Sequence, residues 1–172
     1  HIYFDIIRKT NCKFWFIGTK NEFVANRFKE RISTICKKNN LLIDDFFQFY
    51  PQMHYQEYLE LINKSDVILD SLDWSGLNTS IDSISLDKPV ITLPSNSMRS
   101  KHTSGILKIL KLDELICNSK KEYIDLSVKL SKNLNFRDNI VQKIKMNKKL
   151  IFNNQKTIKF LEDFFISILK NK

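Results

Sequence analysis

A loop rich in glycine and hydroxyl side chains contains the residues of this chain with the clearest potential for chemistry. The stretch SDVILDSLDWSGLNTSIDSISLDKPVITLP spans residues 65–94, and its first apolar run ends at Asp70. Gly76 lets the backbone turn or approach a ligand closely. A helix is expected to begin at Asn78 and Thr79, where free N–H groups and a hydroxyl lie at the positive end of the helix dipole. This is a place where a diphosphate is stabilised.

A second interpretation of the same residues remains open. The spacing Thr79-x-x-Asp82 is also that of a capping box, in which Thr79 satisfies backbone N–H groups and Asp82 reaches back to the helix start. In the ligand-binding interpretation, Asp82 instead accepts hydrogen bonds from a ribose. The chain contains neither the G-x-G-x-x-G fingerprint nor a P-loop, so the local pattern supports neither a standard NAD site nor a P-loop NTPase.

The elements that must position this loop alternate between strands and helices. Short apolar runs predict strands, and apolar residues at helical spacing predict the helices between them. The predicted strands are 13–18, 46–50, 66–71, 89–94 and 114–118, and the intervening helices are 21–40, 55–65, 79–87 and 104–113. This order predicts an α/β fold, a Rossmann-like doubly wound parallel sheet covered on both faces.

After residue 119 the strands stop. Three amphipathic helices are expected at 120–133, 136–152 and 157–170. We therefore expect residues 1–172 to form a single Rossmann-like lobe with a helical tail over 120–172. The segment 160–169 has more apolar surface than a free helix should expose, so we expect it to pack on the sheet or on a missing lobe.

Composition narrows the class of protein and of partner. The chain has 172 residues, 42% hydrophobic and 27% charged, which is an ordinary globular balance. Its net charge of +9 favours an anionic partner. However, Lys, Asn and Ile are abundant throughout, as a genome rich in A and T would produce, and no concentrated basic block or RNA-binding motif is present, so we expect no nucleic acid partner.

The three cysteines and the apolar runs bear on the compartment. Cys12, Cys36 and Cys117 are far apart and odd in number, so neither a disulfide framework nor a zinc site is expected, and a reducing cytoplasm fits best. No apolar run is long enough to span a membrane. The chain starts at His1 rather than at Met, and we expect it to be a fragment of a larger protein.

An ordered series of motifs resembles a known family. The segments DVILD, GLNTS, DKPVITLP, MRSK, LICNSKKEY and LSVKL follow one another over residues 65–130. In order and spacing they are similar to the C-terminal catalytic lobe of the O-linked N-acetylglucosamine transferase and SPINDLY family. The resemblance runs from about residue 6 to the C-terminus and is densest over 65–130.

This resemblance implies a GT-B glycosyltransferase, in which two Rossmann-like lobes hold a nucleotide-sugar between them. It implies inversion at the anomeric carbon, a donor such as UDP-N-acetylglucosamine, no metal or other cofactor, and protein side chains as acceptors. The lobe on the acceptor side, and a phosphate-binding Lys of a Q-x-x-K segment, would lie upstream of His1. The present chain would then hold much of the donor pocket but only part of the active site, with the catalytic residues unknown.

The resemblance also carries over roles for individual residues. Asn78 and Thr79 match positions that hold the diphosphate, Asp82 matches the ribose position, and Gly76 would keep the loop open beside the phosphates. Tyr58 falls where animal members have a His near the base.

Two basic residues and two bulky ones complete this comparison with the family. Arg99 and Lys101 match a basic pair after the fourth strand; they either complement phosphate charge or form a solvated loop. Trp74 and Leu77 are bulkier than the small residues usual around Gly76. A function of another class stays open, namely a non-catalytic Rossmann-like module that binds nucleic acid or a protein through its basic surface.

Overall fold

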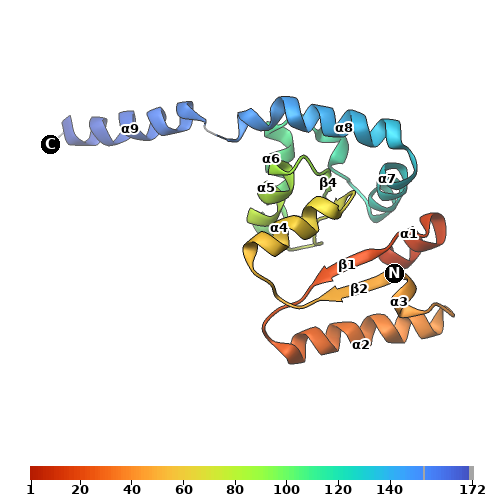
Figure 1. The fold of residues 1–172 in the computed structure, drawn as a ribbon. Coiled ribbons are helices and arrows are strands. Elements are labelled where there is room, and N and C mark those ends of the chain that lie inside the picture. Colours follow the sequence, from red (N-terminus) through yellow and green to blue (C-terminus); the bar gives the residue numbers. More distant parts are fainter. Residues whose placement is uncertain (153, 171–172) are drawn as a thin grey trace.

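The structure is a computed structural model that describes residues 1–152 and 154–170. Helices and strands alternate through the first two thirds of the chain, and helices follow (Figure 1). The elements, in order, are α1 (Ile2–Thr10), β1 (Phe14–Ile17), α2 (Glu22–Lys38), α3 (Ile43–Phe46), β2 (Phe47–Tyr50), α4 (Tyr55–Lys64), β3 (Ile68–Leu69), α5 (Asn78–Ser85), β4 (Val90–Ile91), the 3-10 turn η1 (Met98–Ser100), α6 (His102–Ile109), η2 (Asp113–Leu115), α7 (Lys120–Lys132), α8 (Leu134–Asn147), η3 (Lys148–Leu150) and α9 (Gln155–Lys170).

The first half of the fold is a pair of parallel strands with an aromatic core. β1 and β2 pair from Phe14 opposite Phe47 to Ile17 opposite Tyr50. Alternate side chains of a strand point to the same face, and here that face consists of phenylalanines. They pack against α1 and α2 in a cluster that includes Phe4, Phe14, Phe16, Phe28, Ile32 and Phe47.

The second half has an aliphatic core around a smaller pair of strands. β3 and β4 are parallel, with Ile68 opposite Val90 and Leu69 opposite Ile91. A parallel bridge between Thr92 and Ile116 extends this pair by one more segment. Helices α5 to α8 cover it, and the fully buried side chains of this half include Ile84, Leu107, Leu110, Leu115, Leu130, Ile140 and Ile144. Because this half surrounds the loop between β3 and α5, it is the half that positions the candidate site.

The predicted sheet is present only in part. The alternation of strands and helices and the parallel pairing are confirmed, but the strands form two separate two-stranded sheets, β1–β2 and β3–β4. The expected strand at 114–118 is instead the 3-10 turn η2 followed by the single bridge at Ile116. The apolar run there is buried, but it pairs with its neighbour through only one residue. The helix α1 was not expected from the sequence.

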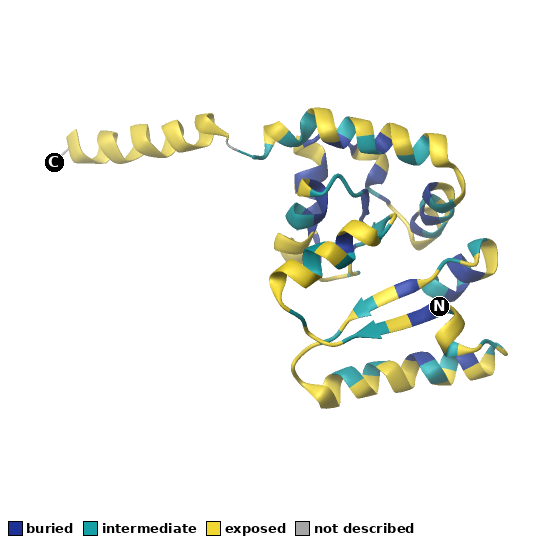
Figure 2. Ribbon diagram, viewed as in Figure 1, coloured by how far each residue is buried: buried dark blue, intermediate teal, exposed yellow. Residues whose placement is uncertain are grey.

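The three C-terminal helices behave differently from one another. α7 and α8 belong to the core, since Tyr123, Leu130 and Ile144 are among its buried residues. α9 stands away from the body of the molecule (Figure 1), and all of its residues are exposed (Figure 2). Of the two partners expected for 160–169, the sheet is therefore excluded, and packing on a missing lobe stays a prediction. Within the described residues, no helix is long and apolar enough to cross a membrane.

Candidate functional site: two helix N-termini around a buried carboxylate

The loop between β3 and α5 turns at Asp73 rather than at its glycine. Asp73 has a left-handed backbone with φ 63°, a conformation that aspartate tolerates better than most residues. Gly76 serves a different need. A Cβ placed on Gly76 would lie 2.2 Å from Thr79 Oγ1 and 3.2 Å from Ser80 Oγ. The absence of a side chain at Gly76 therefore allows the loop to pack closely against the first turn of α5.

The carboxylate of Asp70 holds the loop through three hydrogen bonds. Its side chain is buried, and its Oδ1 accepts a hydrogen bond from the Gly76 N–H at 2.8 Å. Its Oδ2 accepts hydrogen bonds from the hydroxyls of Ser75 at 2.7 Å and Thr92 at 2.6 Å. A carboxylate that receives three donors holds them firmly, since charged hydrogen bonds are the stronger class. The loop is thus tied to the end of β3 and to the strand segment beside it.

A hydroxyl cluster joins the start of α5 to the start of α6. Thr103 Oγ1 lies 2.7 Å from Ser75 Oγ and 2.7 Å from Ser80 Oγ, and it donates to the Gly76 carbonyl at 2.9 Å. The Thr103 N–H donates to Ser75 Oγ at 2.9 Å. Ser75, Ser80 and Thr103 are all buried. Two helix N-termini, each carrying a partial positive charge, are therefore held side by side.

The first turn of α5 has no side-chain cap. The helix starts at Asn78 after Leu77, and no side chain of the described residues caps it. Its first main-chain hydrogen bond runs from the Ile81 N–H to the Leu77 carbonyl. The capping-box interpretation is therefore wrong, because Thr79 lies inside the helix instead of at its cap. Asn78 and Thr79 are exposed, so their side chains and the first N–H groups are available to an anion.

Two tyrosines of α4 lie next to Asp82 of α5. The Tyr55 hydroxyl donates to Asp82 Oδ1 at 2.7 Å, and the rings of Tyr55 and Tyr58 stack with centroids 6.1 Å apart. Burial, with the nearby Asp82 charge, raises the pKa of Tyr58 to about 12. The hydrogen bond to Asp82 raises the pKa of Tyr55. Both phenols therefore stay protonated at neutral pH, and the pair offers an aromatic surface beside a carboxylate.

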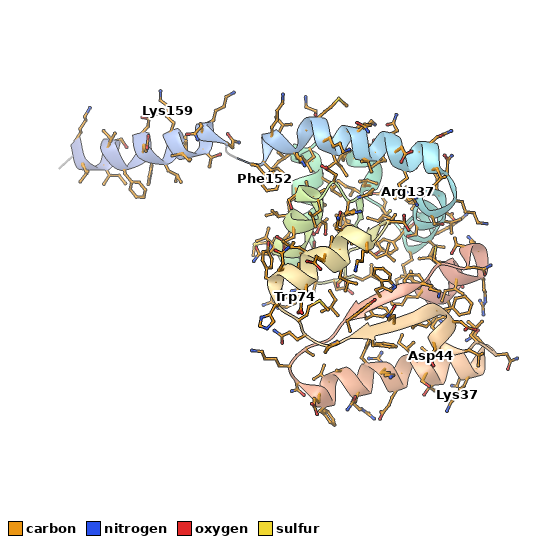
Figure 3. The ribbon with its side chains drawn as sticks, in the orientation of Figure 1. Lys37, Asp44, Trp74, Arg137, Phe152 and Lys159 are labelled. Atoms are coloured by element: carbon orange, nitrogen blue, oxygen red, sulfur yellow. The ribbon has the colours of Figure 1, made fainter. Side chains whose placement is uncertain are left out.

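The basic residues Arg99 and Lys101 lie in η1 and directly before α6. The Arg99 guanidinium sits 4.9 Å from the Trp74 ring centroid, and the Arg99 carbonyl accepts a hydrogen bond from the Ser75 N–H at 2.9 Å. Trp74, labelled in Figure 3, is 64% exposed. Lys101 is exposed and immediately precedes α6. Both cations therefore border the paired helix ends.

The structure thus connects the predicted site residues through contacts among neighbouring elements. Gly76, Asn78, Thr79 and Asp82 lie along the loop and α5, and Arg99 and Lys101 flank the start of α6. Tyr58 joins them through the stack with Tyr55 and its proximity to Asp82.

Sequence reasoning missed Tyr55 and the anchoring role of Asp70. The role of Asp70 could have been predicted, because this aspartate ends a buried strand and precedes a loop rich in Ser and Thr. Among the described residues, no group of three or more His, Cys, Asp or Glu side chains could hold a metal ion.

Comparison with known protein families gives a match over most of the chain. The model of glycosyl transferase family 41 matches residues 24–161, which is well over half of the chain. The chain belongs to glycosyl transferase family 41. The match includes the loop between β3 and α5, both helix N-termini and the tyrosine pair.

The chain is also similar to two individual proteins. The chain is 26% identical over 91 residues to a UDP-N-acetylglucosamine–peptide N-acetylglucosaminyltransferase of Caenorhabditis elegans, covering 53% of this chain and 8% of that protein. It superposes with a TM-score of 0.80 and 22% identity on the K341M mutant of the Thermobaculum terrenum O-GlcNAc transferase, covering 95% of this chain and 32% of that chain. The latter likeness concerns the fold. The chain thus spans only a minor part of the length of either protein.

Proposed function

We propose that this chain is the donor-binding lobe of an inverting glycosyltransferase that takes a nucleoside-diphosphate sugar, UDP-N-acetylglucosamine, and transfers the sugar to protein side chains. Membership of glycosyl transferase family 41 supports the transfer of a sugar. The activity for which the worm relative is named supports the donor and the peptide acceptor. In this proposal, a second lobe of the same protein supplies the acceptor side.

The observation that carries the proposal is the pair of helix N-termini. α5 and α6 are held together by the buried hydroxyls of Ser75, Ser80 and Thr103. The first turn of α5 is uncapped and exposed. Helix N-termini bind phosphate through backbone N–H groups and the helix dipole. A diphosphate at this point would also have Arg99 and Lys101 close to its charge.

In this proposal, the chemical role of these residues is to stabilise the departing diphosphate. When the bond between the anomeric carbon and the diphosphate breaks, negative charge develops on the diphosphate oxygens. N–H groups that are already oriented toward that position stabilise the charge without reorganising. Thr79 would donate its hydroxyl to a phosphate oxygen. Asp82 would use Oδ2 for a ribose hydroxyl, while its Oδ1 accepts the Tyr55 hydroxyl.

The nucleoside would lie against the tyrosine pair. Tyr55 and Tyr58 stack on each other and are joined to Asp82 by the Tyr55 hydrogen bond. Stacking of a base on an aromatic side chain contributes about 1–3 kcal/mol. A ribose held by Asp82 would therefore carry its base toward this aromatic surface, while its diphosphate points to the start of α5.

Calorimetric titration of the chain with UDP tests the proposal. Thr79→Ala removes a hydroxyl from an exposed position, so we expect it to weaken UDP binding by about 10- to 100-fold, in line with a hydrogen bond to a charged group. Asp82→Ala should weaken UDP binding without changing the affinity for inorganic pyrophosphate, which has no ribose. The matched control is Ser85→Ala at the other end of α5, which should bind UDP as the parent chain does.

GDP and ADP, titrated in parallel, determine which base the site selects. Unchanged UDP affinity in both Thr79→Ala and Asp82→Ala would overturn the assigned site. The alternative of a basic binding module makes the opposite prediction. In that case random RNA would bind more tightly than UDP, with an affinity that falls steeply as salt is raised.

A further inference from the structure

A solvent-exposed tryptophan lies in the loop that leads into α5. Trp74 is 64% exposed, although the next residue, Ser75, is buried. Leu77 of the same loop and Met98 of η1 are exposed as well. An indole left in water forgoes a large free energy of burial. Small-molecule sites are lined mainly by apolar and aromatic side chains with a few polar groups among them. Trp74 is therefore a candidate for contact with a ligand.

The main chain on both sides of Trp74 is held in place. Asp73, directly before it, has a left-handed backbone with φ 63°. Ser75, directly after it, donates its N–H to the Arg99 carbonyl at 2.9 Å and its hydroxyl to Asp70 Oδ2 at 2.7 Å. A fixed main chain restricts the directions in which the indole can point. Binding to such a side chain costs little conformational entropy.

The Arg99 guanidinium covers one face of the Trp74 ring. Its central carbon lies over the ring at 4.9 Å from the centroid, within the range of a cation–π contact. An indole has two faces, and the exposure of Trp74 leaves the second face to solvent. None of the ion pairs among the described residues includes Arg99. Its N–H groups are therefore available to a phosphate, which a guanidinium binds through paired hydrogen bonds.

The 3-10 turn η1, which carries Arg99, is also held in place. Ser100 is buried, and its hydroxyl accepts a hydrogen bond from the Ser95 N–H at 2.8 Å. The same hydroxyl donates to the Ser97 carbonyl at 2.8 Å. The bond from Ser75 to Arg99 is between main-chain atoms, so it joins η1 to the loop whatever side chain stands at position 99. The two main chains are thus fixed, and the indole and the guanidinium meet between them.

The order of residues along the loop matches the order of groups in a nucleoside-diphosphate sugar. In the proposed function, Asp82 takes the ribose, while Asn78 and Thr79 take the diphosphate. Asp82 lies one turn into α5, and Trp74 precedes the first residue of that helix. The donor has one base, for which the stacked tyrosine pair of α4 is available. The remaining aromatic side chain is therefore available to the sugar.

A pyranose ring has a suitable shape and polarity for the free face of an indole. In a sugar of the glucose type, the ring C–H bonds point to the two faces and the hydroxyls lie around the edge. Such a ring can place weakly positive C–H groups on the negative face of an aromatic ring while its hydroxyls remain in water. The contact requires no charge on the sugar, and it leaves the Arg99 guanidinium to the neighbouring phosphate.

We propose that Trp74 and Arg99 form the sugar subsite of the donor site. A neutral hexose of the glucose type stacks on the free face of the Trp74 indole, and the Arg99 guanidinium binds the phosphate attached to the anomeric carbon. This subsite presupposes the proposed function, because the diphosphate at the start of α5 determines where the sugar lies. Trp74 then distinguishes a nucleotide-sugar from a nucleotide, whereas Arg99 contributes equally to the binding of both.

Calorimetric titration of the 172-residue chain with UDP, UDP-N-acetylglucosamine and UDP-glucose tests the subsite. Trp74→Ala should weaken the binding of both sugar nucleotides by about tenfold, comparable with the loss of one aromatic stacking contact, and that of UDP by less than about twofold. Trp74→Phe should retain most of the affinity, because a smaller ring still stacks. Arg99→Ala should weaken the binding of all three ligands alike, by about tenfold, because all three carry the diphosphate.

Trp15→Phe is the matched control. Trp15 is the other tryptophan of the chain, at a 36% exposed position of β1, and its substitution should leave all three affinities unchanged. NMR at saturating ligand reports the stacking itself. The pyranose C–H protons of bound UDP-N-acetylglucosamine should shift upfield with the parent chain and with Trp74→Phe, but not with Trp74→Ala, because an aromatic ring shields protons above its face.

The outcomes for the subsite and for the proposed function are distinguishable. Failure of the chain to bind UDP would overturn both. If UDP binds but Trp74→Ala weakens UDP and the sugar nucleotides equally, the proposed function stands and the sugar subsite is wrong. Unshifted pyranose protons with the parent chain would also overturn the subsite. A loss of affinity confined to UDP-N-acetylglucosamine would do the same, because the acetamido group, and not the ring, would then lie on the indole.

Discussion

The interior and the rim of the loop between β3 and α5 are built from similar residue types but differ in how their polar groups are satisfied. In the interior, Asp70, Ser75 and Thr103 are buried and bonded to one another. On the rim, Asn78 and Thr79 are exposed at an uncapped helix end. The buried cluster of Asp70, Ser75 and Thr103 therefore positions the loop, while the exposed residues of the rim remain free to contact a ligand.

The largest effect expected from this comparison is in the interior. Asp70→Ala leaves three donors without their acceptor, two of them on buried residues. We expect a loss of about 3–5 kcal/mol in the free energy of unfolding, as for breaking other buried charged networks. Urea denaturation measures it.

The control for Asp70→Ala is another aspartate without buried partners. Asp138→Ala, at an exposed position of α8, should change the free energy of unfolding by less than about 0.5 kcal/mol. If Asp70→Ala cost no more than Asp138→Ala, the buried group would not be what holds the loop.

The next largest effect is expected at Gly76, where the buried part of the loop contacts the exposed Thr79. Gly76→Ala places a Cβ against Thr79 Oγ1 at 2.2 Å, and we expect overpacking to lower the free energy of unfolding by about 1–3 kcal/mol. Thr79→Ala removes the obstructing atom. The double variant Gly76→Ala/Thr79→Ala should therefore regain most of that loss, as a double-mutant cycle would record. Additive effects of the two substitutions would show that the close contact is not the reason for the glycine.

A smaller effect is expected on the rim beside α4. Tyr55→Phe removes the hydroxyl that donates to Asp82 from an exposed site, so we expect only a small loss of stability. UDP affinity should fall about two- to fivefold, because Asp82 loses the hydrogen bond that orients it. Fluorescence or calorimetric titration gives the affinity. Glu60→Gln, on the exposed side of the same helix, is the control and should leave both quantities unchanged.

The smallest expected effect is a fall in the free energy of unfolding at alkaline pH. The pKa of Tyr58 is raised from 10.0 to about 12 in the folded chain, first by burial and then by Asp82. A raised pKa means that the folded state retains a proton that the unfolded state loses. The stability contributed is therefore complete below pH 10 and declines between pH 10 and 12.

Tyr58→Phe has no phenol to ionise, so its stability should fall less steeply over that interval than that of the parent chain. Urea denaturation at a series of pH values from 9 to 12 compares the two slopes. Parallel curves for the parent and the variant would contradict the role given to Tyr58.

Much of the candidate site could be predicted from sequence because it follows one short segment. The apolar run before Asp70, the glycine and the polar helix start at Asn78 are contiguous, and local rules apply to contiguous residues. The sequence could not decide between a capping box and a free helix end. That choice depended on where the helix begins: α5 starts at Asn78, so Thr79 lies inside the helix and does not cap it.

The sheet was predicted less well for a related reason. Strand-forming runs were located near their observed positions, but pairing depends on which edges lie close enough to bond. Nothing in the runs 13–18 and 66–71 indicates that β1 and β3 belong to two separate sheets. The short strand at 114–118 likewise had a suitable composition, but only Ile116 forms a bridge.

The sequence by itself determined the alternation of strands and helices, the family and the loop that carries the site, because periodicity and motif order are local properties. The tertiary structure alone decided what each polar group bonds to. It placed Thr103 of α6 against Ser75 and Ser80, and so brought a second helix N-terminus beside the first. Contacts between residues far apart in the chain depend on packing, and packing is what determines which polar groups are buried and which remain free for a ligand.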